Sequence, residues 1–386
     1  MSTALYLALK ETWRNRGRFF LFSLVIALIT LLILFIAALG EGLGAGNREY
    51  LENLDADLIV YQDTADLSIA SSRIGCTTRD ALRAVNGVRA VGPIGFSSAT
   101  IAGADGQDDL DISLIGVDPG KPGEPPATAG QGLERRSANE AIIDRMVADV
   151  TGLRVGDRFQ IRSPQGGEEE LYLLKVLGIT ESQMYAIQPS IFVPIVKWDE
   201  IRPQARVSSG AEDPACNVAA VELEDPDQID EMRARLVAQV RNVDVVIRQT
   251  AWENTPGYTA QQQTLNTQNG FALLIGLLVI GGFFQIQTLQ KVPQIGMLKA
   301  IGTPNRTIAL ASLVQIVIIN LLGVLIGGLV TGGVSLIFPP GIPLVFEGQA
   351  IVRALASILV IGPLGGLVSV RLSLRVEPLI ALGLGG

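Results

Sequence analysis

The sequence QKVPQIGMLKAIGTPNRT, residues Gln290–Thr307, decides how this chain folds. The segment is polar, moderately basic and punctuated by glycine and proline, and a long apolar run lies on each side of it. A polar segment held between two membrane spans must lie at a membrane surface, because charged groups are costly inside the hydrocarbon. What binds this segment from the aqueous side is therefore the main functional question.

Four apolar runs are long enough to cross a bilayer, which requires about 20 mostly apolar residues. The runs are Phe19–Leu39, Phe271–Leu289, Ile308–Phe338 and Ala350–Val370. The first run is longer than the roughly 7–15 apolar residues of a secretory signal. We therefore expect it to remain as an uncleaved helix, and we expect the lipid bilayer to surround all four.

The charged residues set the expected orientation. Basic residues cluster before the first run, between the second and third, and after the fourth: Lys10, Arg14, Arg16, Arg18, Lys291, Lys299, Arg306, Arg371 and Arg375. All three clusters fall on one side of the membrane if the runs are helices, and the positive-inside rule makes that side cytoplasmic. Residues 41–267 carry 35 acidic and 20 basic side chains. A domain this acidic is not expected to bind nucleic acid.

These patterns predict an α-helical membrane domain with four transmembrane helices and a large extracytoplasmic α+β domain inserted between helices 1 and 2. Both termini are then cytoplasmic, in a multi-pass protein of the cell membrane. The expected segments are a cytoplasmic interfacial helix (1–18), transmembrane helix 1 (19–40), the extracytoplasmic domain with helical stalks (41–267), transmembrane helix 2 (268–290), a cytoplasmic coupling segment (291–307), transmembrane helix 3 (308–338), an outer loop (339–349), transmembrane helix 4 (350–371) and a cytoplasmic tail (372–386).

Short strands and helices alternate in the expected extracytoplasmic domain. Strand patterns occupy residues 57–61, 112–117, 153–161, 171–179, 191–193 and 244–247, and helix patterns occupy 78–85, 141–150 and 226–240. A Pro/Gly-rich loop ends at Gly132, and we expect the domain to divide near it into two subdomains. In the third apolar run, Gly323/Gly327 and Gly328/Gly332 have the spacing that permits close helix packing.

The sequence lacks the residues of most catalytic sites. There is no histidine, which excludes Ser-His and Cys-His dyads and the HExxH zinc site. No P-loop motif is present either, so no ATP site of that kind is expected in this chain. The acidic runs near Asp109 and Glu169 are interpreted as solvated loops, with no metal expected. Cys76 and Cys216 both lie in the outer domain, where a disulfide and two separate thiols remain equally open.

Residues Gln294–Ile308 resemble the cytoplasmic loop of FtsX-like, MacB-type ABC transporter permeases. The matching positions are Ile295, Gly296, Leu298, Lys299, Ala300, Gly302, Asn305 and Arg306. Gln294 replaces the usual acidic residue and Pro293 the usual basic one. The tail Arg371–Leu382 and the outer stretches Leu153–Gly156 and Leu174–Ile179 are also similar to the family.

The resemblance implies a homodimeric transport subunit without its own ATP site, and therefore not an enzyme by itself. A separate cytoplasmic ABC ATPase dimer, which binds ATP and Mg²⁺, would dock on the coupling segment and drive extrusion of a hydrophobic or amphipathic compound by mechanotransmission. An extracytoplasmic adaptor is a further partner that the family admits. The residues that the resemblance assigns to coupling are Lys291, Gln294, Ile295, Met297, Leu298, Lys299, Thr303, Asn305 and Arg306.

A narrower resemblance is to the haem-efflux (HrtB-like) permeases of Gram-positive bacteria. It is carried by Gly44–Tyr61 and Thr288–Lys299. It implies that haem is the substrate and lies between the first and second helices near the outer boundary. With no histidine available, the expected contacts are Glu41, Tyr50 and Gln285.

Three alternatives to an exporter remain. One is a non-transporting signal transmitter like division-linked FtsX, which acts on extracytoplasmic cell-wall enzymes. The family's FtsX proteins have a much smaller outer domain, which favours export. A lipoprotein-releasing permease and a membrane-anchored enzyme are the others, and the latter lacks catalytic groups.

Overall fold

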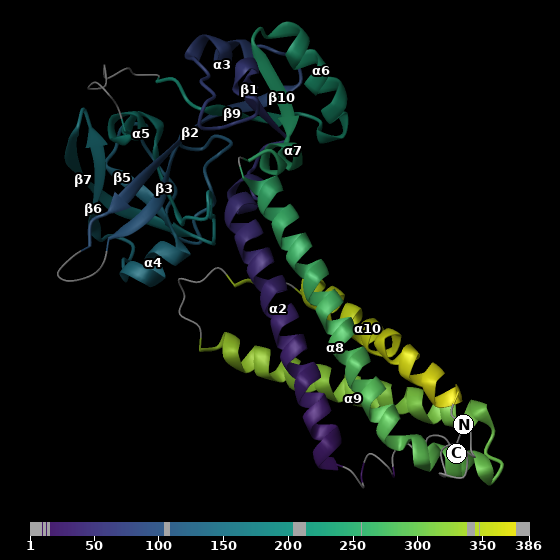
Figure 1. Cartoon of the computed structure of the whole chain (residues 1–386). Helices are drawn as coiled ribbons and strands as arrows, with labels where there is room; N and C mark the ends of the chain where they lie inside the picture. The colour runs from purple at the N-terminus through teal and green to yellow at the C-terminus, as the bar shows by residue number, and fades with distance from the viewer. Residues whose placement is uncertain are drawn as a thin grey trace. The chain divides into compact units, whose positions relative to one another are not determined.

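The computed structural model describes residues 10, 13, 16–103, 109–203, 214–255, 257–337, 344–346 and 348–375 (Figure 1). The chain forms two compact units, which we call the membrane unit (residues 1–42 and 262–386) and the α/β unit (residues 43–261). Most of the expected interfacial helix and outer loop, and the tail from residue 376 onward, lie outside the described residues.

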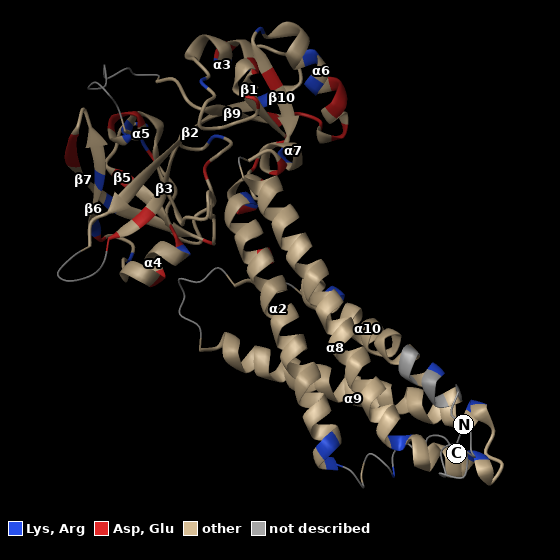
Figure 2. Cartoon of the chain, in the orientation of Figure 1, with Lys and Arg blue, Asp and Glu red and all other residues tan. Residues whose placement is uncertain are grey.

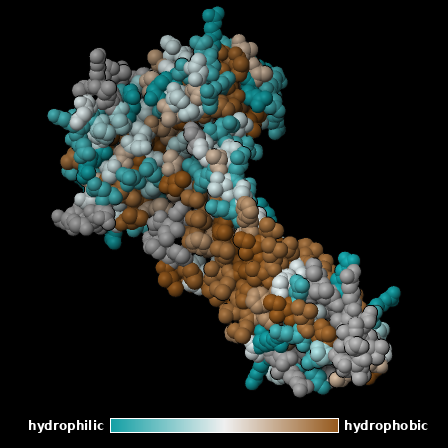
Figure 3. All heavy atoms as spheres, viewed as in Figure 1, coloured by the Kyte–Doolittle hydropathy of each residue, from teal (hydrophilic) through white to brown (hydrophobic). Residues whose placement is uncertain are grey.

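Four long helices build the membrane unit: α2 (Arg16–Glu52), α8 (Tyr258–Ala300), α9 (Asn305–Ser335) and α10 (Gly348–Arg375). Each contains a segment that is long and apolar enough to cross a membrane. Their surface is hydrophobic over the middle of the helices (Figure 3), and Leu28, Leu278 and Leu329 are among the exposed leucines. Leucines exposed in this way are the expected lipid-facing residues of a membrane protein.

Lysines and arginines gather at one end of the membrane unit, which we call the basic end (Figure 2). This end holds Arg16 and Arg18 at the start of α2 and Arg306 at the start of α9. The distribution agrees with the clusters read from the sequence. Arg353, by contrast, lies in the first part of α10 and lines a pocket together with Glu41 of α2.

Helices α2 and α8 are longer than a bilayer requires. α2 has 37 residues and α8 has 43. At 1.5 Å per residue they measure about 55 and about 65 Å, against about 30 Å of hydrocarbon. α2 continues through Gly40–Gly46 and ends at Glu52. α8 does not end at Gln290 but includes Pro293 and continues to Ala300, and α9 begins at Asn305, so most of the expected coupling segment (291–307) is helical.

Glycines allow α9 to approach α2 closely. A Cβ on Gly323 would lie 2.5 Å from the Cβ of Ile26, and a Cβ on Gly327 would lie 2.7 Å from the carbonyl oxygen of Ala27. Gly328 and Gly332 have nothing within 4 Å of an added Cβ. Of the two glycine pairs in α9, the first is therefore the one that packs against α2 among the described residues.

A buried asparagine joins α9 to α10. Pro363 lies inside α10 and has no N–H, so the carbonyl four residues earlier, that of Leu359, loses its helical donor. The amide of Asn320 donates to this carbonyl at 3.3 Å and to that of Ile358 at 3.2 Å. Gly362 makes room for the asparagine, because an added Cβ would collide with its side chain. The proline bend thus has a dedicated hydrogen-bond donor.

The α/β unit is built on one ten-stranded sheet in the order β10-β1-β9-β2-β3-β8-β5-β7-β4, with β6 paired to β2 and β7. The strands are β1 (Leu58–Gln62), β2 (Val88–Ile101), β3 (Leu110–Val117), β4 (Ala129–Gly130), β5 (Glu140–Asp144), β6 (Arg158–Gln165), β7 (Glu168–Thr180), β8 (Ser190–Pro194), β9 (Val218–Leu223) and β10 (Val243–Ile247). The helices are α3 (Cys76–Arg83), α4 (Arg145–Thr151), α5 (Ile195–Ile201), α6 (Ile229–Gln239) and α7 (Arg248–Glu253), with short 3₁₀ turns at Asp63–Ala65 and Pro226–Gln228.

Strand β2 holds this unit together. Its first half pairs with β9 and its second half with β3 (Figure 1). It therefore connects β9, β1 and β10 with the strands from β3 onward in the sheet. The Pro/Gly-rich loop between β3 and β5 was expected to mark a division, and this is wrong. Both strands pair with β8 in the same sheet. The sheet is continuous across the loop because β8, far along the chain, lies between them.

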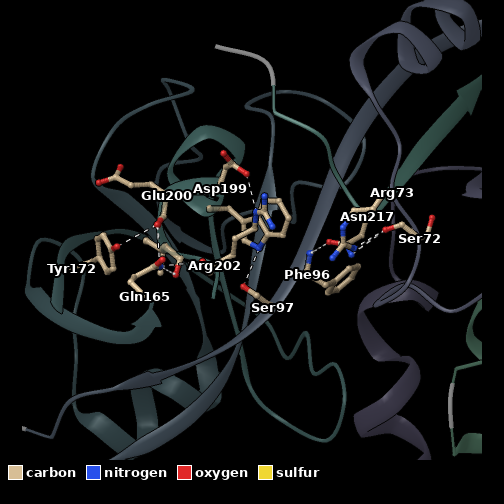
Figure 4. A network of polar contacts seen from close by, with 12 residues as sticks. Ser72, Arg73, Phe96, Ser97, Gln165, Tyr172, Asp199, Glu200, Arg202 and Asn217 are labelled. Carbon is tan, nitrogen blue, oxygen red and sulfur yellow. Dashed lines mark hydrogen bonds and ion pairs between the residues drawn. The ribbon is translucent and has the colours of Figure 1, made fainter. Parts of the chain in front are cut away.

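Helix α5 is fixed against the sheet by Trp198 and Gln165 (Figure 4). The indole of Trp198 packs over β2 and β3, where a Cβ added to Gly95 would lie 2.5 Å from the ring, and its Nε1 donates to the Ser97 hydroxyl at 3.1 Å. The amide of Gln165 donates to the carbonyls of residues 200, 201 and 202. The last carbonyls of a helix have no helical partner, so this side chain caps α5.

The cysteines and acidic runs have plain structural roles. Cys76 is exposed and Cys216 is buried, and both are free thiols. Asp109 forms an ion pair with Arg162 at 2.9 Å. Within the described ranges, no group of three or more Cys, Asp or Glu side chains is arranged to hold a metal ion.

Residues 141–150 were expected to form one helix, and the structure corrects this. Glu140–Asp144 is strand β5, because its apolar side chains fill a central position in the sheet. The helix α4 begins after it, and the Asp144 carboxylate caps α4 by accepting from the Met146 N–H at 2.6 Å. Its second oxygen accepts from the Gln183 N–H at 2.6 Å. Asp144 is fully buried.

Replacing Asp144 by asparagine should change how stability depends on pH. Burial raises the pKa of Asp144 to about 6, and nearby Glu49 adds to this, although three backbone N–H groups oppose it. A pKa raised above the unfolded value of about 3.9 stabilises the fold below that pH, and this contribution is lost as pH rises through 6. We expect wild type to lose about 2 kcal/mol relative to Asp144→Asn between pH 4 and pH 7. Urea unfolding at several pH values measures this, with exposed Asp149→Asn as the control. Equal pH dependence in all three proteins would contradict it.

Candidate functional site

The turn between α8 and α9 is a defined helix terminus. The N–H of Thr303 donates to the Leu298 carbonyl and the N–H of Gly302 to that of Lys299, both at 3.0 Å. This pair of bonds is a Schellman motif, and Gly302 has the positive φ of 88° that it requires. Pro304 follows and cannot continue the helix, so α9 begins at Asn305. The turn is therefore rigidly specified by local sequence.

One face of the last turns of α8 is exposed, and we call it the docking face. It contains Gln290, Gln294, Met297 and Ile301, which lie within about 60° of one another at 100° per residue. Met297 is 59% exposed and Ile301 is 75% exposed. Asn305 and Arg306 continue the exposed surface onto α9. Two large apolar side chains exposed among polar and basic ones are typical of a protein-binding surface.

The two lysines of the segment face other helices of this chain. The Lys291 Nζ donates to Gln315 of α9 at 2.9 Å and lies 5.4 Å from the ring centre of Phe19 on α2. The Lys299 Nζ donates to the carbonyl of Leu374 in α10 at 2.8 Å. Lys291 and Lys299 thus tie α8 to the other three membrane helices at the basic end.

The structure therefore separates the nine residues assigned to coupling. Gln294, Met297, Asn305 and Arg306 are exposed, and Ile295 is buried. The remaining four, which are partly buried, are Lys291, Leu298, Lys299 and Thr303. Ile301 was not among the expected residues, although its position four residues after Met297 places it on the same helical face.

A second candidate site is a pocket of about 290 Å³ toward the other end of the membrane unit. Its walls come from α2, α8 and α10, and we call it the polar pocket. It is lined by Ile33, Ala37, Gly40, Glu41, Gln262, Leu265, Asn266, Asn269, Leu273, Ala350, Arg353, Ala354 and Ser357. Small side chains make the hollow, since Ala37, Gly40, Ala350 and Ala354 all face it.

The polar pocket combines opposite charges with neutral hydrogen-bonding groups. Glu41 on α2 and Arg353 on α10 both line it, and α8 contributes the amides of Gln262, Asn266 and Asn269. The Arg353 guanidinium donates to Gln349 at 3.0 Å, which orients it along α10. Below these groups the lining becomes apolar with Ile33 and Leu273. A ligand with an apolar body and ionic groups matches this lining.

The three side chains expected to contact a substrate are not brought together. Glu41 lines the polar pocket. Tyr50 is 1% exposed in the core of the α/β unit, where its hydroxyl donates to the Gly123 carbonyl at 2.9 Å. Gln285 is exposed on α8, 12 residues beyond Leu273, which is about 18 Å along the helix. The structure thus gives Tyr50 a packing contact and places Gln285 outside the pocket.

The sequence contained a signal for the missed pocket residues. Gln262, Asn266 and Asn269 are spaced i, i+4, i+7 and so form a polar stripe on one face of α8. A polar stripe entering an apolar helix indicates a polar cavity beside it. The position of Arg353 on α10 opposite this stripe required the tertiary structure.

Two family comparisons cover most of the chain. Residues 19–239 match the MacB-like periplasmic core domain, and residues 269–378 match the FtsX-like permease C-terminal family. The first match spans more than half of the chain. The chain therefore belongs to the MacB/FtsX type of ABC transporter permeases, a membrane protein with an extracytoplasmic domain.

Full-length relatives are permeases named for a hemin transport system, HrtB. This chain is 25% identical to the one from Staphylococcus haemolyticus and 23% identical to the one from Staphylococcus epidermidis, over 98% of this chain and 99% of each relative. An uncharacterized ABC transporter permease of Mycobacterium tuberculosis is 26% identical over 28% of this chain and 31% of its own length.

Solved structures of extracytoplasmic domains also match. The extracellular domain of the ABC-type transporter YknZ from Gram-positive bacteria matches with a TM-score of 0.35 and 16% identity, over 49% of this chain and 98% of that one. The periplasmic region of MacB from Actinobacillus actinomycetemcomitans matches with a TM-score of 0.36 and 10% identity, over 52% and 94% of the two chains.

Proposed function

We propose that this chain is the permease subunit of an ABC exporter and that a separate cytoplasmic ATPase binds its docking face. The observation that carries the proposal is the exposure of Met297 and Ile301 at a rigid turn of the basic end. Family membership and the absence of a P-loop motif from the sequence support it. The positive-inside rule would place this end, and with it both termini, in the cytoplasm.

The arrangement of the lysines supports mechanical coupling. A displacement of the α8–α9 turn would act on α9 through Lys291 and on α10 through Lys299, because both side chains bond across helices. α2 and α8 continue beyond bilayer length toward the α/β unit. We therefore propose that closure of the ATPase dimer moves the helices and the extracytoplasmic domain together, without a reaction in this chain.

We further propose that two copies assemble side by side in the membrane. Gln285 supports this, because it is exposed on α8 between Phe284 and Ile286, within the expected span Phe271–Leu289. A polar amide facing lipid is costly, and a second copy would cover it. An extracytoplasmic adaptor remains a further expected partner.

The proposed substrate is an amphipathic compound of the haem class, which enters the polar pocket. The names of the full-length relatives point to hemin. Haem has a flat apolar body with two carboxylates, and Arg353 offers a guanidinium of the kind that pairs with carboxylates. Glu41, on the opposing helix α2, offers a carboxylate oxygen that can coordinate a metal ion such as the haem iron. These groups fit the ligand class by chemistry.

Substitutions on the docking face test the proposal. Met297→Glu with Ile301→Glu should abolish co-purification with the partner ABC ATPase and lower the ATPase activity of the complex at least about tenfold, because burying two unpaired carboxylates costs several kcal/mol. Ala300→Glu, an exposed position about 100° from Ile301, is the matched control and should retain both. Retained association in the double variant would sink the docking face as the binding surface.

Haem titration of the purified chain tests the substrate class. We expect an absorption shift of the haem Soret band on binding to wild type, and a weaker affinity by about tenfold for Glu41→Gln and for Arg353→Gln, since each removes a charge-assisted contact. Tyr50→Phe is the control and should bind like wild type, because the Tyr50 hydroxyl is already bonded to Gly123. If the haem spectrum does not change when wild type is added, haem is excluded as the substrate. The proposal that an ATPase binds the docking face is then unaffected.

A further inference from the structure

One polar cleft of the α/β unit has an unusual charge. It measures about 560 Å³ and lies on β5, β6 and β7. Arg135, Arg158 and Lys175 line it together with a single acidic side chain, Glu140. This part of the chain is otherwise acidic, with 35 acidic and 20 basic residues between positions 41 and 267. We call this hollow the basic cleft.

Two of its cations lie side by side on neighbouring strands of the sheet. Arg158 of β6 and Lys175 of β7 are direct partners in the antiparallel register. Like charges placed opposite each other on adjacent strands repel and destabilise the pair. Neither side chain has an ion pair or hydrogen bond with any residue that the structure describes. Lys175 also lies beside Glu140 in the register of β5 and β7, but the Glu140 carboxylate forms its ion pair with Arg135, so the three cations share a single negative charge.

On the same strand, another arginine has its charge compensated by carboxylates. Arg162, four residues after Arg158 on β6, lies 2.9 Å from Asp109 and 3.5 Å from Glu169. β6 thus pairs one of its two arginines with carboxylates and leaves the other beside a lysine. A negative charge supplied from outside would complete the second position as the carboxylates complete the first.

The rest of the lining is also short of partners. Arg135 donates to one oxygen of Glu140 at 3.2 Å, and the other oxygen, Oε2, is buried with no hydrogen-bond partner in the described structure. A bound group that carries a hydroxyl would satisfy it. Ser137 and Asn139 add a hydroxyl and an amide at the rim of the cleft. The three cations and one carboxylate leave a formal charge of +2.

We propose that the basic cleft binds a phosphate group carried by an extracytoplasmic ligand. A phosphate monoester offers about two negative charges and several acceptor oxygens, and the guanidinium of Arg158 can bind two of these in parallel. A hydroxyl on the alcohol part of such a monoester, as in glycerol 3-phosphate, can donate to Glu140. The proposal is independent of the ATPase and of haem, because it concerns residues of the α/β unit alone.

Isothermal titration of the full-length protein in detergent, in low-salt buffer, tests the proposal. The probes are inorganic phosphate, glycerol 3-phosphate and dihexanoyl phosphatidic acid. We expect Arg158→Gln with Lys175→Gln to weaken binding by about tenfold to a hundredfold, since two charge-assisted contacts are lost. Binding of the first two probes would identify a soluble phosphate, and binding of the third alone would identify a lipid headgroup.

A charge-matched control separates the cleft from general electrostatics. Arg154 and Lys121 are exposed outside the cleft, and Arg154→Gln with Lys121→Gln should bind within twofold of wild type. Arg135→Gln gives a second cleft variant on a loop. Without phosphate the Arg158/Lys175 variant should melt no lower than wild type, because a repulsive pair is gone. No binding of any probe, or equal weakening in both double variants, would overturn the proposal.

Discussion

Gly327→Leu is expected to prevent stable packing of α9 against α2. An added Cβ would already lie 2.6 Å from the Cβ of Thr30 and 2.7 Å from the Ala27 carbonyl oxygen. The Ala27 oxygen belongs to the backbone and cannot rotate away, so the helices must separate. Overpacking a core costs about 1–3 kcal/mol when side chains can adjust. Here the cost should exceed this range, and Gly323 beside it faces the same constraint from Ile26.

The next residue provides a matched control. Gly328 has nothing within 4 Å of an added Cβ, so Gly328→Leu makes the same change in the same helix without a clash. We expect thermal unfolding in detergent, followed by circular dichroism, to show a much lower midpoint for Gly327→Leu. Gly328→Leu should stay close to wild type in monomeric protein. Equal midpoints for the two variants would show that the α2–α9 contact does not determine stability.

Trp198→Ala is expected to destabilise the α/β unit by about 3–5 kcal/mol, the usual cost of removing a large aromatic side chain from a core. Trp198 is 2% exposed and fills the space that Gly95 and Gly116 leave open on β2 and β3. Its loss would create a cavity that two glycines cannot fill, and it would remove the hydrogen bond to Ser97. The cation–π contact with Arg202 at 5.2 Å would also disappear.

Another tryptophan serves as the comparison. Trp252 is half-buried and packs edge-on against Tyr258 at 5.4 Å. Trp252→Ala should therefore lower the urea midpoint less than Trp198→Ala does. Limited proteolysis at increasing urea reports the unfolding of this unit in the full chain. If the two variants unfolded at the same urea concentration, Trp198 would contribute no more to the stability of the α/β unit than Trp252 does.

The membrane helices could be predicted from the sequence because their signal is local. Three of the four apolar runs lie inside one helix each, and most of the third, Ile308–Phe338, forms α9, which ends at Ser335. The residues at which the helices end were harder to predict. Pro293 indicates a break, yet α8 continues through it, since one missing hydrogen bond is affordable in a helix packed on its neighbours. Tertiary contacts such as that of Lys291 with Gln315 decide this, and they lie far apart in sequence.

The α/β unit was harder to predict because its sheet is built from distant pairs. β2 was missed, although it is the longest strand, because Gly92, Pro93 and Gly95 interrupt its pattern. Those glycines are explained by the structure, since Gly95 lies against Trp198. β5 was taken for part of a helix because Ala141–Asp144 has no alternation. A strand buried on both faces loses that signal.

The candidate site shows the same division. The docking face follows from helical spacing and the Gly302 stop, both readable from the sequence. The polar pocket needs three helices to meet, so only Glu41 was identified from the chain itself. Lys291 and Lys299 were assigned to coupling by the family resemblance, and the structure shows that both side chains bond to other helices of this chain. Charge alone does not say which way a long side chain points.

The glycine-rich part of α2 has a mechanical consequence. Gly40, Gly42, Gly44 and Gly46 each weaken the helix by about 1 kcal/mol relative to alanine. The boundary between the two units falls among them, after Gly42. A rod under load bends where it is softest, so α2 should flex at this point before it flexes in the leucine-rich part. The stiffness of this one segment, residues 40–46 with their four glycines, would then determine how much of a movement at one end of α2 reaches the other end.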